Sequence, residues 1–146
     1  MTLKNAFDEF MFQKELAGLS PASLSDYRNY ITIMLNHVGE SMDLESVTYE
    51  LVAGYIMVLL HRPLSKATIS TYVRNARIFL RWVHAEYGLS FDPVKIKVPK
   101  PPKKNVHVLS SAEIQYLLDS VKCSVPWLTA RNKAIIALML DSGLRD

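Results

Sequence analysis

Hydrophobic residues recur at steps of three and four through most of the chain, which is the spacing of one face of an α-helix. This pattern predicts helices over residues 3–16, 21–38, 49–60 and 66–87. After a break, it predicts a helix that begins beside Ser110 or Ser111 and an apolar helix that ends at Gly143. Glycine is scarce, at five residues, and runs of alternating Val, Ile and Thr are few. The sequence therefore predicts an all-α fold.

Two of these helices begin with similar sequence segments, SPASLSDY at 20–27 and SKATISTY at 65–72. In each, a serine stands where a helix N-cap is expected, and a second Ser or Thr follows three residues later. Helix capping by itself can produce this repeat, because Ser and Thr are favoured at any helix start.

Charge is distributed unevenly along the chain. Residues 1–61 hold three Lys or Arg against eight acids, a net charge of −5. Residues 62–104 hold ten against two, a net charge of +8, and residues 105–146 hold four of each. Such a concentration of basic residues is typical of a surface that binds a polyanion. The alternative is an ordinary solvated surface beside a lysine-rich linker.

The helix over 66–87 separates its hydrophobic and basic residues on a helical wheel. The predicted core face consists of Ile69, Tyr72, Val73, Ala76, Leu80, Val83 and Tyr87. Beside it runs a stripe without acids, which consists of Lys66, Ser70, Arg74, Arg77 and Arg81. A row of cations along a helix suits the major groove of a DNA duplex. Ile78 and Trp82 lie away from the core face and suggest a second packing surface.

Residues 92–106 contain four prolines and five lysines and no glycine. Proline prevents helix formation and keeps the backbone extended, so this segment is predicted to be a semi-rigid linker between domains. Its lysines either follow a phosphate backbone or only keep the linker soluble. Residues 107–146 are then expected to begin a second domain.

Several classes of function are not supported by the sequence. Cys123 is the only cysteine, and no Cys or clustered His lies near it to complete a zinc site. The longest apolar runs, at 55–60 and 134–140, are too short to cross a membrane, and the first residues contain no apolar signal core. We expect a cytoplasmic protein that needs no metal or other cofactor and has no small-molecule substrate or membrane partner.

The motifs taken together resemble those of the tyrosine recombinases, a family of site-specific integrases. The resemblance covers the S-x-x-T-I-x-x-Y and R-I-F-L-R-W stretches of the fourth helix and the proline-lysine segment. It also covers the run from VLSSAEIQYLL to RNKAIIALMLDSGLRD. It implies a four-helix, orthogonal, SAM-like core-binding domain over 1–91, a linker over 92–106, and the start of an α+β catalytic domain over 107–146. The catalytic domain would be incomplete.

The resemblance also implies a chemistry. It assigns Arg145 as the first of two arginines that bind the scissile phosphate, a role that suits a planar, permanently charged guanidinium. The family's His-x-x-Arg motif is absent, and all seven tyrosines precede Arg145. The complete enzyme would cut DNA through a 3′-phosphotyrosine without a cofactor, whereas this chain is expected to bind DNA and not cut it.

In the family, two helices of the first domain meet the DNA major groove as half of a C-shaped clamp. The residues that the resemblance and the charge pattern together nominate for DNA contact are Ser23, Ser25, Arg28, Lys66, Thr68, Ser70, Arg74, Arg77, Arg81, Lys100, Lys103 and Lys104. The expected partners are a double-stranded recombination site and other recombinase protomers on that DNA. A helical module that binds a protein or an RNA, with no role in recombination, is the alternative.

Overall fold

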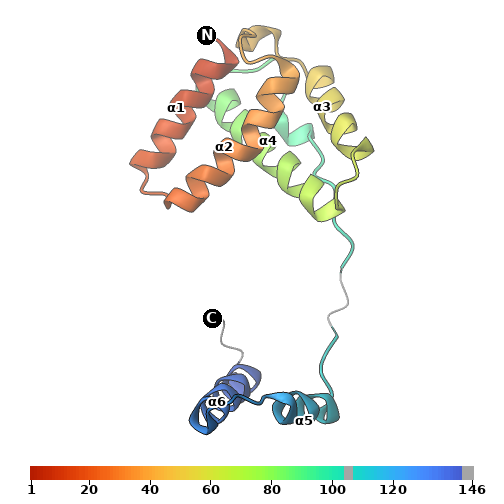
Figure 1. The fold of residues 1–146 in the computed structure, drawn as a ribbon. Coiled ribbons are helices and arrows are strands. Elements are labelled where there is room, and N and C mark those ends of the chain that lie inside the picture. Colours follow the sequence, from red (N-terminus) through yellow and green to blue (C-terminus); the bar gives the residue numbers. More distant parts are fainter. Residues whose placement is uncertain (104–106, 143–146) are drawn as a thin grey trace. The chain divides into compact units, whose positions relative to one another are not determined.

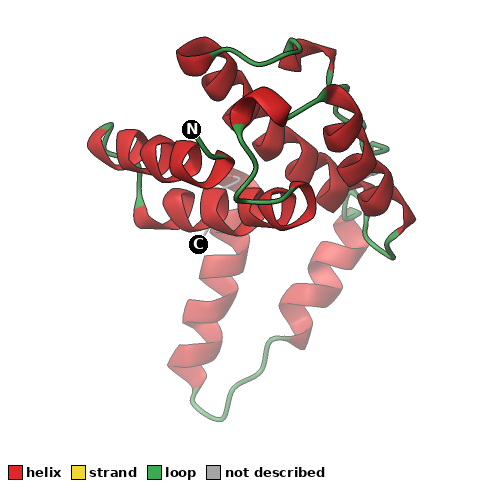
Figure 2. Cartoon of the chain, turned by 90° about the horizontal axis from the view of Figure 1, so that it is seen from above, coloured by secondary structure: helices red, strands yellow, loops and turns green. Residues whose placement is uncertain are grey.

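The described residues, 1–103 and 107–142 of a computed structural model, form helices joined by loops and contain no β-strand (Figure 2). They divide into two compact units, one that ends at Lys103 and one that contains residues 107–142. Arg145 and Lys104, both nominated from the sequence, lie outside the described residues. No helix within the described ranges has the length and hydrophobicity that a membrane span requires. The predicted all-α class is confirmed.

The first unit contains four α-helices, which Figure 1 labels α1 to α4. Their bounds are Leu3–Leu16, Pro21–Val38, Tyr49–His61 and Lys66–Tyr87. Two short 3₁₀ turns, η1 at Leu44–Ser46 and η2 at Pro93–Lys95, were not predicted. The four long helices agree with the sequence prediction to within one residue at each end.

Helix capping accounts for the similar sequences of residues 20–27 and 65–72. The Ser20 hydroxyl accepts a hydrogen bond from the backbone N–H of Ser23, and the Ser65 hydroxyl accepts one from that of Thr68. In each pair the two hydroxyls are also within hydrogen-bond distance, at 3.1 Å in α2 and 2.8 Å in α4. The hydroxyls of Ser23 and Thr68 therefore each support the cap of their own helix. Helix capping is sufficient to explain why the two segments have similar sequences.

Helix α4 is the central helix of this unit and packs against α1, α2 and α3. Its buried residues are Ile69, Ser70, Val73, Ala76, Phe79, Leu80 and Val83. Two details of the predicted core face were wrong: Phe79 is fully buried, whereas Tyr87 is exposed. The reason is that α1 covers the side of α4 beyond the predicted face. There the Phe79 ring makes an edge-on contact with Phe10, and Trp82 donates a hydrogen bond to Gln13.

The chain after α4 turns back and packs on the first unit. Phe91, Pro93 and Ile96 are buried, and Val98 is partly buried against the same core. Asp92 caps the η2 turn, because its carboxylate accepts a hydrogen bond from the N–H of Val94. The predicted linker, 92–106, therefore includes residues that are fixed to the first unit, since their hydrophobic side chains have a core to join.

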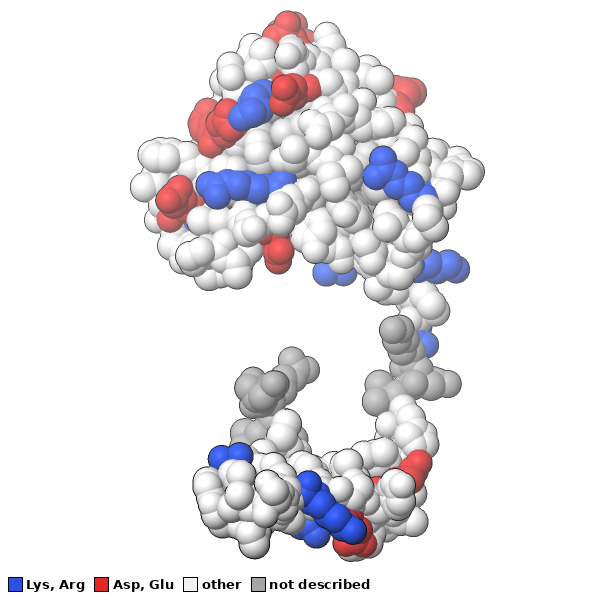
Figure 3. Space-filling model, in the orientation of Figure 1, with Lys and Arg blue, Asp and Glu red and all other residues white. Residues whose placement is uncertain are grey.

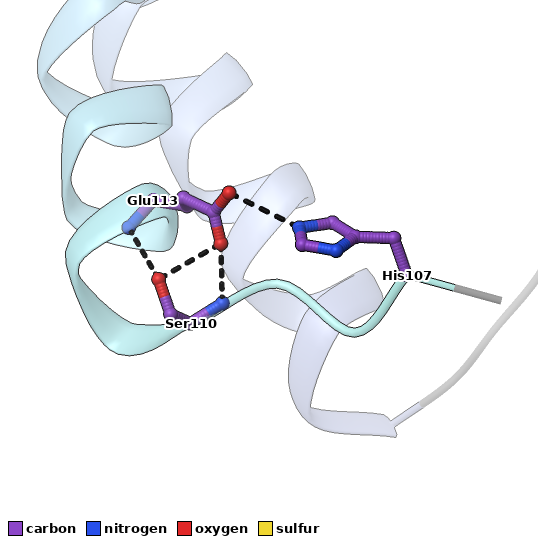
Figure 4. Close-up of polar contacts among 3 residues, drawn as sticks. All are labelled: His107, Ser110 and Glu113. Atoms are coloured by element: carbon purple, nitrogen blue, oxygen red, sulfur yellow. Dashed lines mark hydrogen bonds and ion pairs between the residues drawn. The ribbon is translucent and has the colours of Figure 1, made fainter.

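The second unit contains α5 at Ser111–Ser120 and α6 at Pro126–Ser142. None of the residues in either helix is buried. Local interactions are nevertheless well formed at the start of α5 (Figure 4). Ser110 caps the helix by accepting from the N–H of Glu113, and the Glu113 carboxylate accepts from the N–H of Ser110 at 2.8 Å. His107 lies 3.1 Å from the same carboxylate.

This capping box predicts a pH dependence for α5. The backbone and hydroxyl groups of Ser110, and then His107, lower the pKa of Glu113. A lowered folded-state pKa means that the stabilisation is present above the ordinary Glu value, 4.5, and is lost as the pH falls through the folded-state pKa. We expect the carboxyl ¹³C resonance of Glu113 to titrate below the ordinary value, and Ser110→Ala to raise its midpoint. A wild-type midpoint at or above that of an unstructured Glu would contradict the capping box.

Candidate nucleic-acid interface

The basic stripe of α4 is present, but it is not a uniform exposed row. Arg74 and Arg81 are exposed, Arg77 is half-buried, and Ser70 is only 2% exposed. The wheel placed Ser70 among solvent-facing residues, and the structure corrects this. The cause is the segment after α4, which packs beside this flank of the helix and covers Ser70 and part of Arg77.

Arg77 connects the helix to that segment. Its guanidinium donates a hydrogen bond of 3.2 Å to the backbone carbonyl oxygen of Ile96, 19 residues further along the chain. This bond uses one of the five N–H donors of the guanidinium, so most of them remain for a ligand. It also holds the following residues beside α4, which brings Lys100 near the arginines.

A shallow hollow of about 340 Å³ lies between α4 and the returning segment. It is lined by Ser70, Arg74, Arg77, Val98, Pro99, Lys100 and Pro101. Three of these residues are cationic and none is acidic. Ser70 lines the hollow although its residue is almost fully buried. A hydroxyl and three cations around one hollow are a suitable set of donors for a phosphate group.

A second hollow, of about 250 Å³, lies between α2 and α4. Its lining residues are Ser23, Asp26, Tyr27, Tyr30, Thr71 and Asn75. The rings of Tyr30 and Tyr72 meet edge to face, with centroids 5.1 Å apart, and join the two helices beside this hollow. Ser23 is the one nominated residue of α2 that lines this hollow. The acidic residue Asp26 also lines it.

The remaining nominated residues are placed less closely together. Ser25 and Arg28 are exposed on α2 and line neither hollow. Lys66 is exposed at the first position of α4, and Thr68 is half-buried with its hydroxyl in the helix cap. Lys103 is exposed at the end of the first unit. The structure thus brings together four nominated residues, Ser70, Arg74, Arg77 and Lys100, around one hollow.

The basic residues of this interface are not neutralised by the acidic amino-terminal third. Between residues 1 and 103 and between 107 and 142, the ion pairs are Met1–Asp43, Lys4–Asp8 and His107–Glu113. None of them involves a residue of the α4 stripe. Figure 3 shows most Asp and Glu on the upper and left parts of the first unit, where basic side chains also lie, and further Lys and Arg on its right side, at its lower right edge and on the segment that leaves it. The charged residues that line the hollow are therefore all cationic and are not held in these ion pairs.

Sequence reasoning nominated Ser70 and Ser23 but missed other uncharged residues of the two hollows. Pro99 and Pro101 shape the first, and Thr71 and Asn75 contribute hydroxyl and amide groups to the second. Asn75 lies one helical turn after Thr71 and donates to its carbonyl oxygen. The sequence signal that could have identified Thr71 and Asn75 is their four-residue spacing, because this spacing places both side chains on one side of the helix.

The chain is similar to curated tyrosine recombinases over most of its length. It is 32% identical to tyrosine recombinase XerD of Oceanobacillus iheyensis over 143 residues, which are 94% of this chain and 47% of that protein. It is 29% identical to the putative tyrosine recombinase TTE1313 of Caldanaerobacter subterraneus, covering 94% of the chain and 48% of that protein. With tyrosine recombinase XerA of Saccharolobus solfataricus the identity is 27%, covering 98% of the chain and 47% of that protein.

The chain thus spans about half the length of the curated relatives it matches. No protein-family model matches it. No solved structure matches it either.

Proposed function

This chain is a relative of the tyrosine recombinases, and from that premise we propose that its first unit binds double-stranded DNA through α4 and the segment beside it. The observation that supports this most directly is the hollow of Ser70, Arg74, Arg77 and Lys100. Its charged donors are all cationic, and the guanidinium of Arg77 is held in place by the backbone carbonyl of Ile96. Such a fixed guanidinium loses less conformational entropy when it binds a phosphate oxygen.

The contacts divide by their chemistry. Arg77, Ser70 and Lys100 lie around the hollow and are proposed to hold one backbone phosphate, which positions the protein without reading sequence. Arg74 and Arg81 are exposed on the same stripe and have the reach to meet further phosphates or the edges of guanine bases. The other nominated residues are proposed to extend the contact with DNA; they are Ser23, Ser25, Arg28, Lys66, Thr68, Lys103 and Lys104.

We further propose a part for this chain in DNA strand exchange by a tyrosine recombinase, with other recombinase protomers bound to the same DNA. In that reaction a tyrosine attacks a phosphodiester and forms a 3′-phosphotyrosine, and Arg145 is proposed to bind the scissile phosphate. The 146 residues are proposed to bind DNA without cutting it. Conversion of supercoiled plasmid to relaxed plasmid by the purified chain would contradict this.

The salt dependence of binding tests the electrostatic basis of the proposal. If four to six basic groups meet phosphates, the logarithm of the association constant should fall against the logarithm of the salt concentration with a slope of roughly −4 to −5. Fluorescence anisotropy with a labelled duplex, measured over a salt series, gives this slope. A slope near zero would show that cations of the stripe do not contact the duplex.

A further inference from the structure

The hollow between α2 and α4, called the α2–α4 hollow below, differs in chemistry from the cationic hollow. Its lining residues are Ser23, Asp26, Tyr27, Tyr30, Thr71 and Asn75, so no Lys or Arg lines it. Asp26 is exposed and takes part in none of the three ion pairs found between residues 1 and 103 and between 107 and 142. A carboxylate without a cationic partner repels phosphate. This hollow is therefore unsuited to the DNA backbone.

Two residues of α4 in this hollow already use hydrogen-bond donors on their own helix. The Thr71 hydroxyl donates its single proton to the carbonyl oxygen of Ala67 at 3.1 Å. The Asn75 side-chain amide donates to the carbonyl oxygen of Thr71 at 2.9 Å. The lone pairs of the Thr71 hydroxyl, the amide oxygen of Asn75 and one of its N–H groups remain for a ligand.

The whole lining of the hollow is therefore richer in acceptors than in donors. The Asp26 carboxylate can only accept, and the Thr71 hydroxyl has only its acceptor capacity left. The hydroxyls of Ser23, Tyr27 and Tyr30 can either donate or accept, so they adapt to a ligand. A ligand group that donates a hydrogen bond, such as an amino group, is the chemical match.

The α2–α4 hollow adjoins the side of α4 that is proposed to meet phosphates. Thr71 and Asn75 share one side of the helix, and Arg74, directly before Asn75, lies about 100° around it. Arg74 lines the cationic hollow, and neither it nor Arg28 of α2 lines the α2–α4 hollow. A helix that lies in the major groove meets phosphates beside the groove and base edges at its floor. The arrangement places acceptors where base edges would lie.

The major groove offers amino groups at two kinds of base. Cytosine presents the N4 amino group and adenine the N6 amino group, whereas guanine and thymine present acceptor oxygens at the corresponding place. A carboxylate accepts a hydrogen bond from either amino group and is repelled by the oxygens. Every base pair contains one amino base, so the preference concerns which strand carries it at the position next to the hollow.

We propose that the α2–α4 hollow is a base-reading site, in which Asp26, Thr71 and Asn75 bind the exocyclic amino group of a cytosine or an adenine. This inference rests on the proposed function, because it requires α4 to lie in the major groove of a duplex. It adds a position where sequence is read, next to the cationic hollow that holds a phosphate of any sequence. Asp26 is the residue that excludes guanine and thymine.

Selection of duplexes from a random pool tests this with wild-type protein and Asp26→Ala. The change is made at an exposed helical position and raises helix propensity, so the fold should be retained, as circular dichroism checks. We expect one position of the wild-type consensus to hold C or A, with a preference of roughly tenfold over the inverted base pair. Asp26→Ala should lose the preference at that position alone and bind the inverted duplex more tightly than wild type does.

Base analogues show which amino group is bound. In the selected duplex, 2-pyrimidinone replaces the cytosine or purine replaces the adenine, and each analogue lacks only the amino group. Wild-type protein should lose roughly tenfold in affinity with the matching analogue, and Asp26→Ala should lose less than about twofold. Thr71→Val, which removes the hydroxyl at similar volume, should lose part of the preference. Equal losses in wild type and Asp26→Ala would overturn the proposal.

The matched control is Glu15→Ala, which removes the same charge from an exposed position of α1 and should leave the consensus unchanged. Loss of the preference in this control too would assign it to net charge and overturn the inference. A wild-type consensus that Asp26→Ala does not alter would overturn it as well and would leave duplex binding as proposed. The acceptors would then suit a lysine of a protein partner. A wild type that binds no duplex would instead remove the proposed function and this inference together.

Discussion

Changing Arg74 and Arg81 together to glutamate is expected to weaken duplex DNA binding by roughly 100-fold or more at physiological salt. Both side chains are exposed, and neither makes a side-chain hydrogen bond or ion pair to another described residue, so the fold should be unaffected. The change removes two cations from the stripe and adds two anions that repel phosphate. The salt slope should also fall by about two in magnitude. Fluorescence anisotropy with a labelled duplex measures both effects, and circular dichroism checks the fold.

Arg77 is left unchanged in this design because its hydrogen bond to the Ile96 carbonyl also holds the returning segment. The matched control is Arg62→Glu with Lys122→Glu, which makes the same change in net charge at exposed positions outside the interface. We expect this control to retain binding within about fivefold. Equal losses in both double variants would mean that net charge alone, and no particular surface, determines binding.

The same two double variants distinguish binding of duplex DNA from the alternative function, recognition of a protein or an RNA. A helical module that recognises a protein or an RNA would bind duplex DNA weakly, and its binding would not depend on Arg74 and Arg81. A parallel titration with duplex RNA of the same sequence compares the two nucleic acids. Tighter binding of the RNA, unaffected by the Arg74 and Arg81 changes, would favour the rival.

Replacing Phe79 with alanine is expected to lower the free energy of unfolding of the first unit by about 3–5 kcal/mol. Phe79 is fully buried, and its ring contacts Phe7 and Phe10 edge-on and stacks with Trp82. Alanine would leave a cavity between α1 and α4, and three aromatic rings would lose a partner. Urea unfolding monitored by tryptophan fluorescence and circular dichroism measures the loss.

A loss of this size can unfold the domain completely, so a milder variant keeps the prediction measurable. Phe79→Leu retains most of the volume and is expected to cost about 1–2 kcal/mol. Tyr87→Leu is the comparison on the same helix, because Tyr87 belonged to the core face predicted from the sequence and is exposed in the structure. It should change stability by less than about 1 kcal/mol. A larger effect at Tyr87 than at Phe79 would contradict the observed packing of α4.

Local rules explain why the helices could be predicted so closely. The start of α4 depends on Ser65 and Thr68, three residues apart, and the start of α2 on Ser20, Pro21 and Ser23. Capping hydrogen bonds join neighbours in sequence, so their partners can be read from the residues themselves. The amino-acid sequence by itself therefore determined the helices of the first unit, their caps, and the concentration of cations in the fourth helix.

Only the tertiary structure decided what those cations surround. A wheel describes one helix with one buried side, but α4 is covered by three helices and by the segment that returns after Gly88. For this reason Phe79 and Ser70, on opposite edges of the predicted core face, are both buried. Contacts between residues far apart in sequence, such as Arg77 with Ile96, depend on how the chain folds back. Helical periodicity contains no information about such contacts, because it records only neighbours within one helix.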